Sequence, residues 1–292
     1  IQNGTIARDG NLNTCNGGNG DRSDFRLLSI YLNTNLTLQN LTLQNGCAQN
    51  VDNEAHFDNY GGAIFHTGDT LLLNAVHLLA NSGGVGGGIY VGNNTTFIAA
   101  NSSFVGNELN SSGNEGAAYA QLFDVQAIFV NTTFSQNDGT GGDVLRLTRD
   151  DNTLSLINST FTENTANDLI SVNDPANDTY QFHNTVFANN TVTNNCHADV
   201  VNAATLSATD SYSDDGSCNF AANGGADNVV NTFGSLATAP NGTQYHPLTG
   251  GPAAQGGSNN LLPTEADLGL DVDQDGTIEG TKIGIDQRNG MR

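Results

Sequence analysis

The feature that most constrains this fold is a seven-residue phrase that occurs five times. Each copy begins with asparagine, carries an apolar residue at its fourth position and ends with asparagine or glycine. The copies occupy residues 40–46, 101–107, 131–137, 158–164 and 184–190. The last four begin at Asn101, Asn131, Asn158 and Asn184, which are 30, 27 and 26 residues apart. A repeat of this length, with turn residues at fixed offsets and no helical period, predicts a stacked solenoid.

Strand patterns before each phrase indicate which kind of solenoid. Two and four residues before the leading asparagine the side chain is mostly apolar, as Leu154 and Leu156 are before Asn158. This period of two is typical of strands with one buried face. Further upstream come glycine-led runs at 61–65, 87–91, 116–119 and 142–147. Three short strands per repeat, stacked about 4.8 Å from the next coil, predict an all-β fold, a single right-handed parallel β-helix.

This register makes specific predictions about the interior. The apolar residues of four phrases should form one stack, and the leading asparagines should form a ladder at a turn. The four apolar residues are Phe104, Phe134, Phe161 and Phe187. Residues 71–81 fit less well because Asn74 and Asn81 are seven residues apart, so we expect a one-residue bulge near His77. The length corresponds to roughly eight to ten coils.

The ends of the chain are less repetitive than its middle. We expect an irregular N-terminal cap at 1–26, β-helix repeats at 27–220, and final coils with a cap at 221–292. A β-helix leaves strand edges at both ends, and bare edges pair with other chains. The irregular segments are therefore expected to cover the ends or wrap the side. If an edge stays bare, self-association into filaments follows.

Composition excludes several classes of partner. The formal charge is −22 with a pI near 4.1, so nucleic acid and anionic membranes are unfavourable partners. No apolar run approaches the roughly 18 residues of a membrane span. The chain opens at Ile1 without methionine or a signal peptide, which we interpret as processing or trimming.

Four cysteines fall as one pair near each end of the repeats. They lack zinc-binding spacing, so we predict disulfides Cys15–Cys47 and Cys196–Cys218 in an oxidising, extracellular compartment. The alternative is four free buried thiols in a cytosolic protein. Glycosylation sequons at Asn101, Asn131 and Asn158 coincide with the repeat's own asparagines, which favours a structural role for them.

Several motifs resemble a known group of proteins. Residues 61–64, together with the Phe-x-x-Asn motifs at 104–107, 134–137, 161–164 and 187–190, look like polymorphic outer-membrane-protein repeats. The stretch 262–292 resembles the closing segment of secreted choice-of-anchor proteins, although Asn289 interrupts the usual Asp-Gln-Arg-Gly motif. The resemblance covers about residues 27–292. It implies a bacterial secreted β-helix with a surface role and no defined catalytic residues.

The sharpest local motif resembles a calcium loop. Its oxygen ligands lie at loop positions 1, 3, 5, 7 and 9, with glycine at position 6, as calcium loops require. These ligands are Asp271, Asp273, Asp275, Thr277 and Glu279. The expected acid at position 12 is replaced by Lys282, and Asp286 could supply the missing carboxylate. We predict a structural calcium ion, and the alternative is an acidic solvated turn.

A second acidic site follows from the expected stacking of turns. Asp150 and Asp151 should lie beside Asp174 and Asp178, with Asp124 one coil away. Stacked carboxylates need a cation, protonation or outward splaying, and splaying into solvent is the commonest outcome.

The same edge holds the one concentrated basic–acidic cluster, formed by Arg146, Arg149, Asp150 and Asp151. If the chain is an enzyme, these are its candidate catalytic residues. The structural alternative is that they form salt bridges between coils. The six histidines show no metal-binding spacing, and His66 and His183 are expected on exposed strand faces.

Because the chain has few lysines and arginines and its strands carry regular polar residues, we favour an exported structural or adhesive protein that binds a surface glycan or a second copy. The alternative is a calcium-assisted carbohydrate-active enzyme, a polysaccharide lyase or glycoside hydrolase. A lyase needs a base and cations at its substrate's carboxylate, and a charge of −22 repels uronates.

Overall fold

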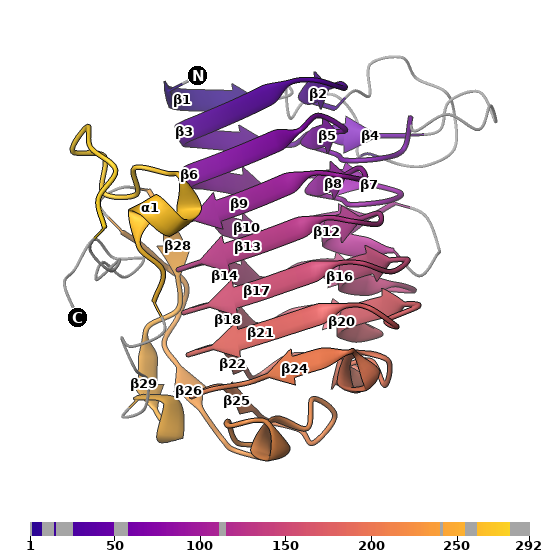
Figure 1. Ribbon diagram of the computed structural model, residues 1–292, viewed down its shortest axis with the longest axis vertical. Helices are drawn as coiled ribbons and strands as arrows, with labels where there is room; N and C mark the ends of the chain where they lie inside the picture. The colour runs from indigo at the N-terminus through magenta and orange to yellow at the C-terminus, as the bar shows by residue number, and fades with distance from the viewer. Residues whose placement is uncertain are drawn as a thin grey trace.

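Short strands stack coil upon coil into a parallel β-helix (Figure 1). The computed structural model describes residues 2–7, 15, 26–49, 58–110, 115–239, 242–254 and 262–280. All strand pairs within the coils are parallel, and each strand bonds to its equivalents in the coils above and below. The predicted all-β solenoid is confirmed.

The first sheet has seven strands and contains the glycine-led runs. In order they are β2 (Leu28–Ile30), β5 (Ile64–His66), β8 (Ile89–Val91), β12 (Gly116–Gln121), β16 (Asp143–Thr148), β20 (Asp168–Asn173) and β23 (Asn194–Cys196). A five-stranded sheet covers a second side. Its members are β4 (Cys47–Ala48), β7 (Ser82–Gly83), β11 (Glu108–Leu109), β15 (Asp138–Gly139) and β19 (Thr165–Ala166).

The remaining two sides merge into one thirteen-stranded sheet because β3 (Asn35–Gln44) and β6 (Thr70–Leu79) each run through both of them. One arm holds β9 (Thr96–Ala100), β13 (Gln126–Val130), β17 (Thr153–Ile157), β21 (Thr179–His183) and β24 (Thr205–Ser207). The other arm holds β10 (Ser103–Val105), β14 (Thr133–Ser135), β18 (Thr160–Thr162), β22 (Val186–Phe187) and β25 (Tyr212–Ser213). At one end β1 (Gln2–Ala7) pairs with β3.

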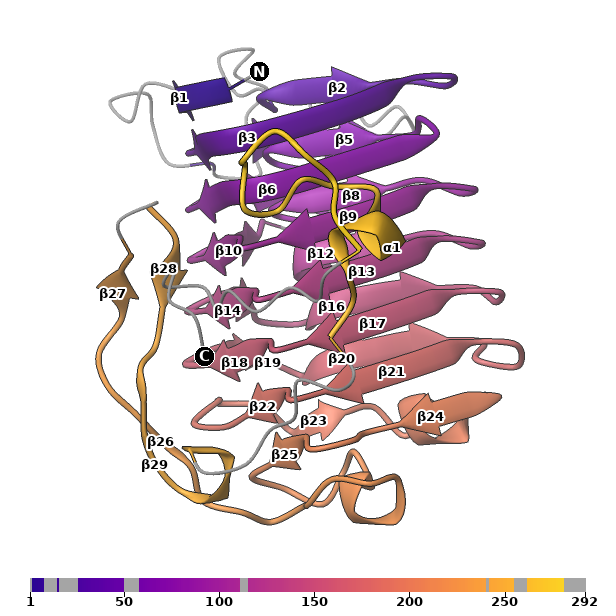
Figure 2. The same ribbon diagram turned by 60° about the vertical axis from the view of Figure 1, so that its left-hand side comes forward.

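The helix has fewer coils than the eight to ten expected. Among the described residues, five coils contribute a strand to all three sheets, because the smallest of these three sheets has five strands. From about residue 231 the chain stops coiling and runs back along the side (Figure 2). This return contains β26 (Thr232–Phe233), β27 (Ala237–Thr238), β28 (Gln244–Tyr245), β29 (Leu248–Gly250), the 3-10 helix η3 (Pro252–Ala254) and helix α1 (Glu265–Leu268).

Hydrogen bonds hold the returning segment against the solenoid. The Thr243 hydroxyl donates to the Asn101 carbonyl at 2.8 Å. His246 is buried, with Nε2 2.9 Å from the Ser135 hydroxyl and Nδ1 2.9 Å from the Gly234 carbonyl. The returning residues therefore do not form further coils but cover one side of the helix.

The predicted phenylalanine stack is confirmed. Phe104, Phe134, Phe161 and Phe187 are 0% exposed and lie at one register. Ring centroids of successive members are 4.8, 4.3 and 4.9 Å apart, and only the last pair turns edge to face. Such aromatic contacts add to the stability that burial of the rings provides.

A fifth ring closes the column at the C-terminal end. Phe220, in the 3-10 helix η2 (Phe220–Ala222), is 0% exposed, and its ring centroid lies 5.5 Å from those of Phe182 and Phe187. The Ala208 amide donates to the Asn223 carbonyl at 2.8 Å, so this cap also pairs with the last coil. Both predicted disulfides are present, and Cys196–Cys218 anchors the cap.

The leading asparagines form the predicted ladder. Each Nδ2 donates to the Oδ1 of the previous coil, at 3.0 Å from Asn131 to Asn101, 3.0 Å from Asn158 to Asn131, and 2.9 Å from Asn184 to Asn158. All four residues have φ between 48° and 51°, in the left-handed region where asparagine is enriched. Because these side chains are bonded to their neighbours, the structural interpretation of their sequons holds.

The bulge expected near His77 is wrong. β6 pairs with β9 and β10 at a constant offset, with Thr70 opposite Thr96 and His77 opposite Ser103. Ala75 therefore occupies the ladder position, with φ 53°, and lies six residues before Asn81. Asn74 is the residue before the turn, from where its Oδ1 still accepts from Asn101 Nδ2 at 3.4 Å, so no extra residue has to be accommodated.

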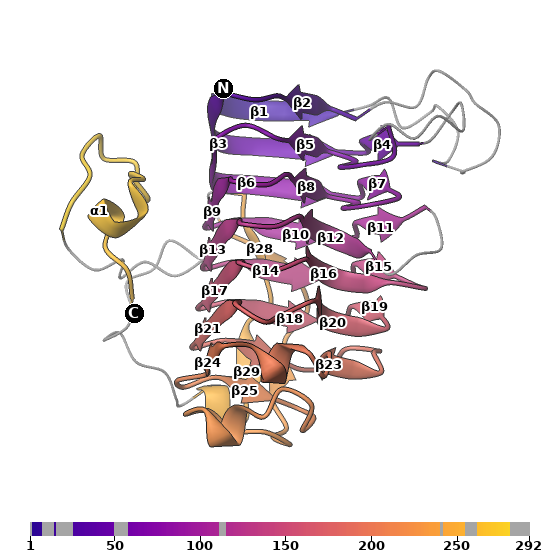
Figure 3. The same ribbon diagram turned by 45° about the vertical axis from the view of Figure 1, so that its right-hand side comes forward.

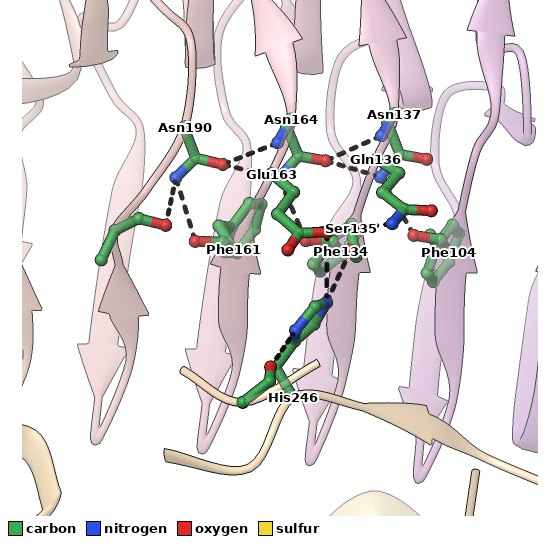
Figure 4. A network of polar contacts seen from close by, with 12 residues as sticks. Phe104, Phe134, Ser135, Gln136, Asn137, Phe161, Glu163, Asn164, Asn190 and His246 are labelled. Atoms are coloured by element: carbon green, nitrogen blue, oxygen red, sulfur yellow. Dashed lines mark hydrogen bonds and ion pairs between the residues drawn. The ribbon is translucent and has the colours of Figure 1, made fainter. Parts of the chain in front are cut away.

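The closing asparagines of the phrases form a second ladder, which sequence analysis did not predict (Figure 4). The Oδ1 of Asn137 accepts from both the backbone amide and Nδ2 of Asn107, each at 3.1 Å. Its own Nδ2 donates to the Phe104 carbonyl at 3.0 Å and to Asn164 Oδ1 at 2.9 Å. The pattern repeats from Asn81 to Asn190. From Asn81 to Asn190, successive coils are thereby bonded to one another through side-chain amides, which are buried in all but the last coil.

Candidate metal centre and neighbouring polar clusters

The acidic loop belongs to a segment that we call the strap, residues 262–280. Thr264 caps α1, accepting from the Asp267 amide through its hydroxyl while the Asp267 carboxylate accepts from the Thr264 amide. Gly269 ends the helix at φ 61°, a left-handed value that glycine adopts without strain. The loop then turns through Gln274 and Gly276, both with positive φ.

Three carboxylates meet in the strap. Oxygens of Glu265, Asp271 and Asp273 lie within 4.8 Å of one another. One oxygen of Asp271 accepts from the Gly276 amide at 3.0 Å, whereas its Oδ1 is buried without a hydrogen-bond partner among the described residues. An unpartnered buried carboxylate oxygen is costly unless a donor or cation reaches it.

Glu265 was missed by sequence analysis. It lies on α1, six residues before the loop, and its side chain is only 5% exposed. Its carboxylate accepts from the amides of Val272 at 2.6 Å, Asp273 at 3.0 Å and Glu279 at 3.1 Å. Glu265 thus holds the two ends of the loop together. It also supplies the cluster with a carboxylate from outside the loop, in addition to those expected from the loop itself.

The other predicted ligands lie differently. The Asp275 carboxylate accepts from the Thr277 amide at 2.9 Å and from its hydroxyl at 2.7 Å, and these bonds lower the Asp275 pKa. The Thr277 hydroxyl also lies 3.4 Å from Glu279 Oε1. Among the described residues, the carboxylate cluster consists of Glu265, Asp271 and Asp273, and none of these three other residues belongs to it. Asp286 and Lys282 lie outside the described residues.

Electrostatics makes the cluster receptive to a cation. Desolvation raises the Asp273 pKa, and the nearby carboxylates of Glu265, Asp275 and Asp271 raise it further. A cation at the centre would relieve this repulsion. Clustered carboxylate oxygens are the hard ligands that Ca²⁺ prefers.

Arg146 belongs to a different cluster from the one predicted. It lies on the outer face of β16, where Nη1 is 3.3 Å from the Asp143 carboxylate and donates to the Ser171 hydroxyl at 2.6 Å. Burial raises the pKa of Asp143, which Arg146 partly offsets. Burial likewise raises the pKa of Glu115. The charge of Arg146 lowers this pKa, and that of Asp143 raises it.

The other three residues of the predicted basic–acidic set lie at the turn. Arg149 is exposed, with its guanidinium 5.9 Å from the centroid of the Phe123 ring. Asp150 is half-buried and Asp151 exposed. No hydrogen bond or ion pair joins Arg146 to either aspartate in the part of the chain that the structure describes.

The stacked acidic turns do not all splay into solvent. Asp124 and Asp174 are exposed, but Asp178 is 0% exposed and accepts from the Asn152 amide at 2.7 Å and from the Tyr180 hydroxyl. Burial raises the Asp178 pKa, and these hydrogen bonds oppose the rise. This carboxylate therefore has a structural role at the turn.

The expected exposure of His66 is wrong. His66 is 0% exposed because the alternation of β5 turns it inward with Ile64, while Phe65 faces out. Burial lowers the pKa of His66 to about 4. His183 is half-buried, and desolvation lowers its pKa as well.

No protein-family model, curated protein or solved structure matches this chain. In the described ranges, no helix has both the length and the apolar character needed to cross a membrane. The two disulfides are consistent with an extracellular location.

Proposed function

We propose that this chain is an exported extracellular or cell-surface structural protein whose β-helix provides a rigid polar surface for adhesion or self-association. One observation carries the proposal. Outward-facing hydroxyls recur at one register along the thirteen-stranded sheet, one coil apart. The column comprises Thr70, Thr96, Thr153, Thr179 and Thr205, with Gln126 between the second and third.

This column suits an extended polar partner. Its members are half-buried or exposed, and the coil spacing of about 4.8 Å places hydroxyls at regular intervals. A repeating neutral surface fits a glycan chain better than a small substrate, which needs a concave pocket. The disulfides support export, and the motif resemblance to polymorphic outer-membrane-protein and choice-of-anchor proteins supports a surface role.

Co-sedimentation with insoluble neutral polysaccharides tests the proposal. The triple variant Thr96→Val, Thr153→Val and Thr179→Val keeps side-chain shape but removes three hydroxyls from the column. We expect it to lose at least tenfold in retention. The matched control replaces three exposed threonines on another side of the helix, Thr165, Thr191 and Thr193, with valine. Equal retention of both triples, or no retention of the wild type, would contradict glycan adhesion through this column.

A structural calcium ion is part of the proposal. Glu265, Asp271 and Asp273 are the residues proposed to hold it, and the buried unpartnered oxygen of Asp271 supports this assignment. Bound calcium would fix the loop and neutralise part of the strap's negative charge.

A carbohydrate-active enzyme is the second candidate, favoured by two carboxyls beside Arg146. Glu115 and Asp143 both have a pKa raised by burial, as general acids often do. A screen of acidic and neutral polysaccharides for cleavage products tests it. Turnover that is lost in Glu115→Gln and Arg146→Ala but kept in the exposed Asp174→Asn would support the enzyme. Absence of products across the panel would reject it.

A further inference from the structure

The seven-stranded sheet, which Figure 3 shows running the length of the helix from β2 to β23, carries aromatic and basic side chains on its outer face. Phe65 pairs with Tyr90, Tyr90 with Ala120 and Ala120 with Arg146, so these four residues share one register. The rings of Phe65 and Tyr90 stack with their centroids 5.5 Å apart, and the Tyr60 ring centroid lies 4.6 Å from that of Tyr90. Phe65 and Tyr90 are buried, whereas Tyr60 is half-buried and reaches the surface.

The positive charge of the described residues is concentrated on this side. Every arginine among them, Arg26, Arg146 and Arg149, lies on the outer face of the sheet or at the turn beside it, and these residues include no lysine. Cζ of Arg26 lies 4.7 Å from the Phe65 ring centroid, and Cζ of Arg149 lies 5.9 Å from that of Phe123. Because salt screens charges beyond about 8 Å, these guanidiniums can attract an anion locally although the whole chain carries a charge of −22.

Arg149 is the arginine whose charged group remains open to a ligand. Arg146 donates to Asp143 and Ser171, and Arg26 donates to a backbone carbonyl at 3.1 Å. Arg149 is exposed, and its guanidinium makes no hydrogen bond or ion pair with another described residue. Its five N–H donors are therefore free to bind an anion from solution.

The guanidinium of Arg149 acts in a different direction from the two aspartates that follow it. Burial raises the pKa of the Tyr90 hydroxyl, and the positive charge of Arg149, two coils further on, lowers it. Burial also raises the pKa of Asp178 in the next coil, and the charges of Asp150 and Asp151 raise it further. The guanidinium thus lies toward the earlier coils and the carboxylates toward the later one, which leaves its charge uncompensated on the aromatic side.

The backbone at Arg149 also points to a role for its side chain. Arg149 directly follows β16 and has φ 69°, in the left-handed region where asparagine, aspartate and glycine are favoured. The residue directly after β20 is Asp174, with φ 70°. Arginine is the more strained choice for this turn, and strain of this kind is found at functional sites.

The groups around the guanidinium indicate which anion fits. A sugar ring has an apolar face that packs on an aromatic ring, and Phe123 and Tyr60 are both half-buried beside the positive charge. A carboxylate on such a sugar matches the planar fork of Arg149. Glu115 lies near both tyrosines, because its charge adds to burial in raising the pKa of Tyr60 and Tyr90. Burial raises the pKa of Glu115 as well, which favours its neutral form and weakens its repulsion of an anion.

We propose that Arg149, Phe123 and Tyr60 form a binding site for a carboxylated sugar residue of an acidic glycan. Arg149 binds the carboxylate, and the two rings pack against the sugar. This site goes beyond the threonine column, which lies on the thirteen-stranded sheet and is proposed to bind neutral glycans.

Calorimetric titration of the full chain with an oligosaccharide of galacturonic acid, at physiological salt, tests the site. Arg149→Asn removes the guanidinium and suits the left-handed turn, so it should keep the wild-type fold and bind about tenfold or more weakly. Arg149→Lys keeps the charge but loses the planar fork, and should bind with intermediate affinity. The matched control is Asn189→Asp, which makes the chain one charge more negative at an exposed turn residue with φ 61° on another side. It should bind as the wild type does.

The methyl ester of the same oligosaccharide keeps the sugar rings but has no carboxylate charge, and should bind about tenfold or more weakly than the acid. Equal affinity for acid and ester, equal affinity of Arg149→Asn and the wild type, or no binding by the wild type overturns the site. Competition by inorganic phosphate at the concentration of the oligosaccharide also overturns it, because charge alone would then be recognised. Arg149→Asn should still be retained on neutral polysaccharides, so failure of this site and failure of the threonine column give different results.

Discussion

Replacing Asn137 with alanine tests whether the closing asparagines hold the coils together. Asn137 is 1% exposed and makes four hydrogen bonds through its side chain. Alanine removes all four without changing the apolar stack beside them. The turn itself is retained, since the left-handed residue there is Gln136, with φ 57°.

The magnitude follows from which partners are left unsatisfied. Asn107 Nδ2 keeps the Leu78 carbonyl, and Asn164 Oδ1 keeps the Asn137 amide. The buried Asn107 amide, however, loses the acceptor it has at 3.1 Å, and the Phe104 carbonyl loses a donor. An unsatisfied buried group costs about 1–3 kcal/mol, so we expect the free energy of unfolding to fall by about 2–4 kcal/mol.

Urea unfolding followed by circular dichroism measures this loss. The matched control is Gln136→Ala, one residue away, which removes only an exposed hydrogen bond to Glu163 and should cost under about 0.5 kcal/mol. If Asn137→Ala unfolds at the same urea concentration as Gln136→Ala, the amide ladder does not stabilise the stack and our reasoning about it is refuted.

Three further predictions concern the cap, the buried histidine and the strap. Replacing Cys196 and Cys218 with alanine opens a link between residues 22 apart and should lower the free energy of unfolding by about 3 kcal/mol in urea. Because burial lowers the pKa of His66 to about 4, the unfolded chain binds a proton that the folded chain does not between about pH 6.5 and 4. Stability should therefore fall as pH falls through that window, by at most about 1.4 kcal/mol per pH unit, and His66→Leu should flatten the slope. Millimolar calcium should raise Tm, and Asp271→Asn should abolish the increase.

Each of these predictions has an outcome that contradicts it. Wild-type urea resistance in the double cysteine variant would show that the cap holds without its disulfide. A pH slope of stability that is unchanged in His66→Leu would assign the effect to other groups. Identical melting curves in chelator and calcium would rule out a structural calcium ion, and exposed Asp151→Asn should keep any calcium response.

Spacing in the sequence was sufficient to predict the columns because a residue at a fixed phase recurs at the same place in every coil. This is why Phe104 and Asn101 find their equivalents above and below them. It failed at Asn74, where residue type suggested the ladder position but the continuous strand β6 places Ala75 there. The backbone register, and not the identity of one side chain, decides which residue turns.

The second ladder depended on backbone conformation that spacing does not encode. Gln136, Glu163 and Asn189 precede closing asparagines and take φ values of 57°, 59° and 61°. That left-handed turn directs the following asparagine inward. Because these residues are of different types, no shared residue signals the turn.

The strap could be predicted only in part. The acidic loop is recognisable because its ligands are close in sequence, whereas Glu265 reaches the loop through the fold of α1. Docking against Asn74 and Asn101 joins segments more than 170 residues apart, and nothing periodic connects them.

Hydrogen exchange of side-chain amides, followed by NMR, tests most directly the central claim that asparagines bridge successive coils. The Nδ2 protons of Asn107, Asn137 and Asn164 should exchange as slowly as backbone amides of the neighbouring strands, because they are buried and doubly bonded. Exposed Asn94 and Asn177 should exchange freely. Equal, rapid exchange in both sets would contradict the ladder and with it the stacking on which this account rests.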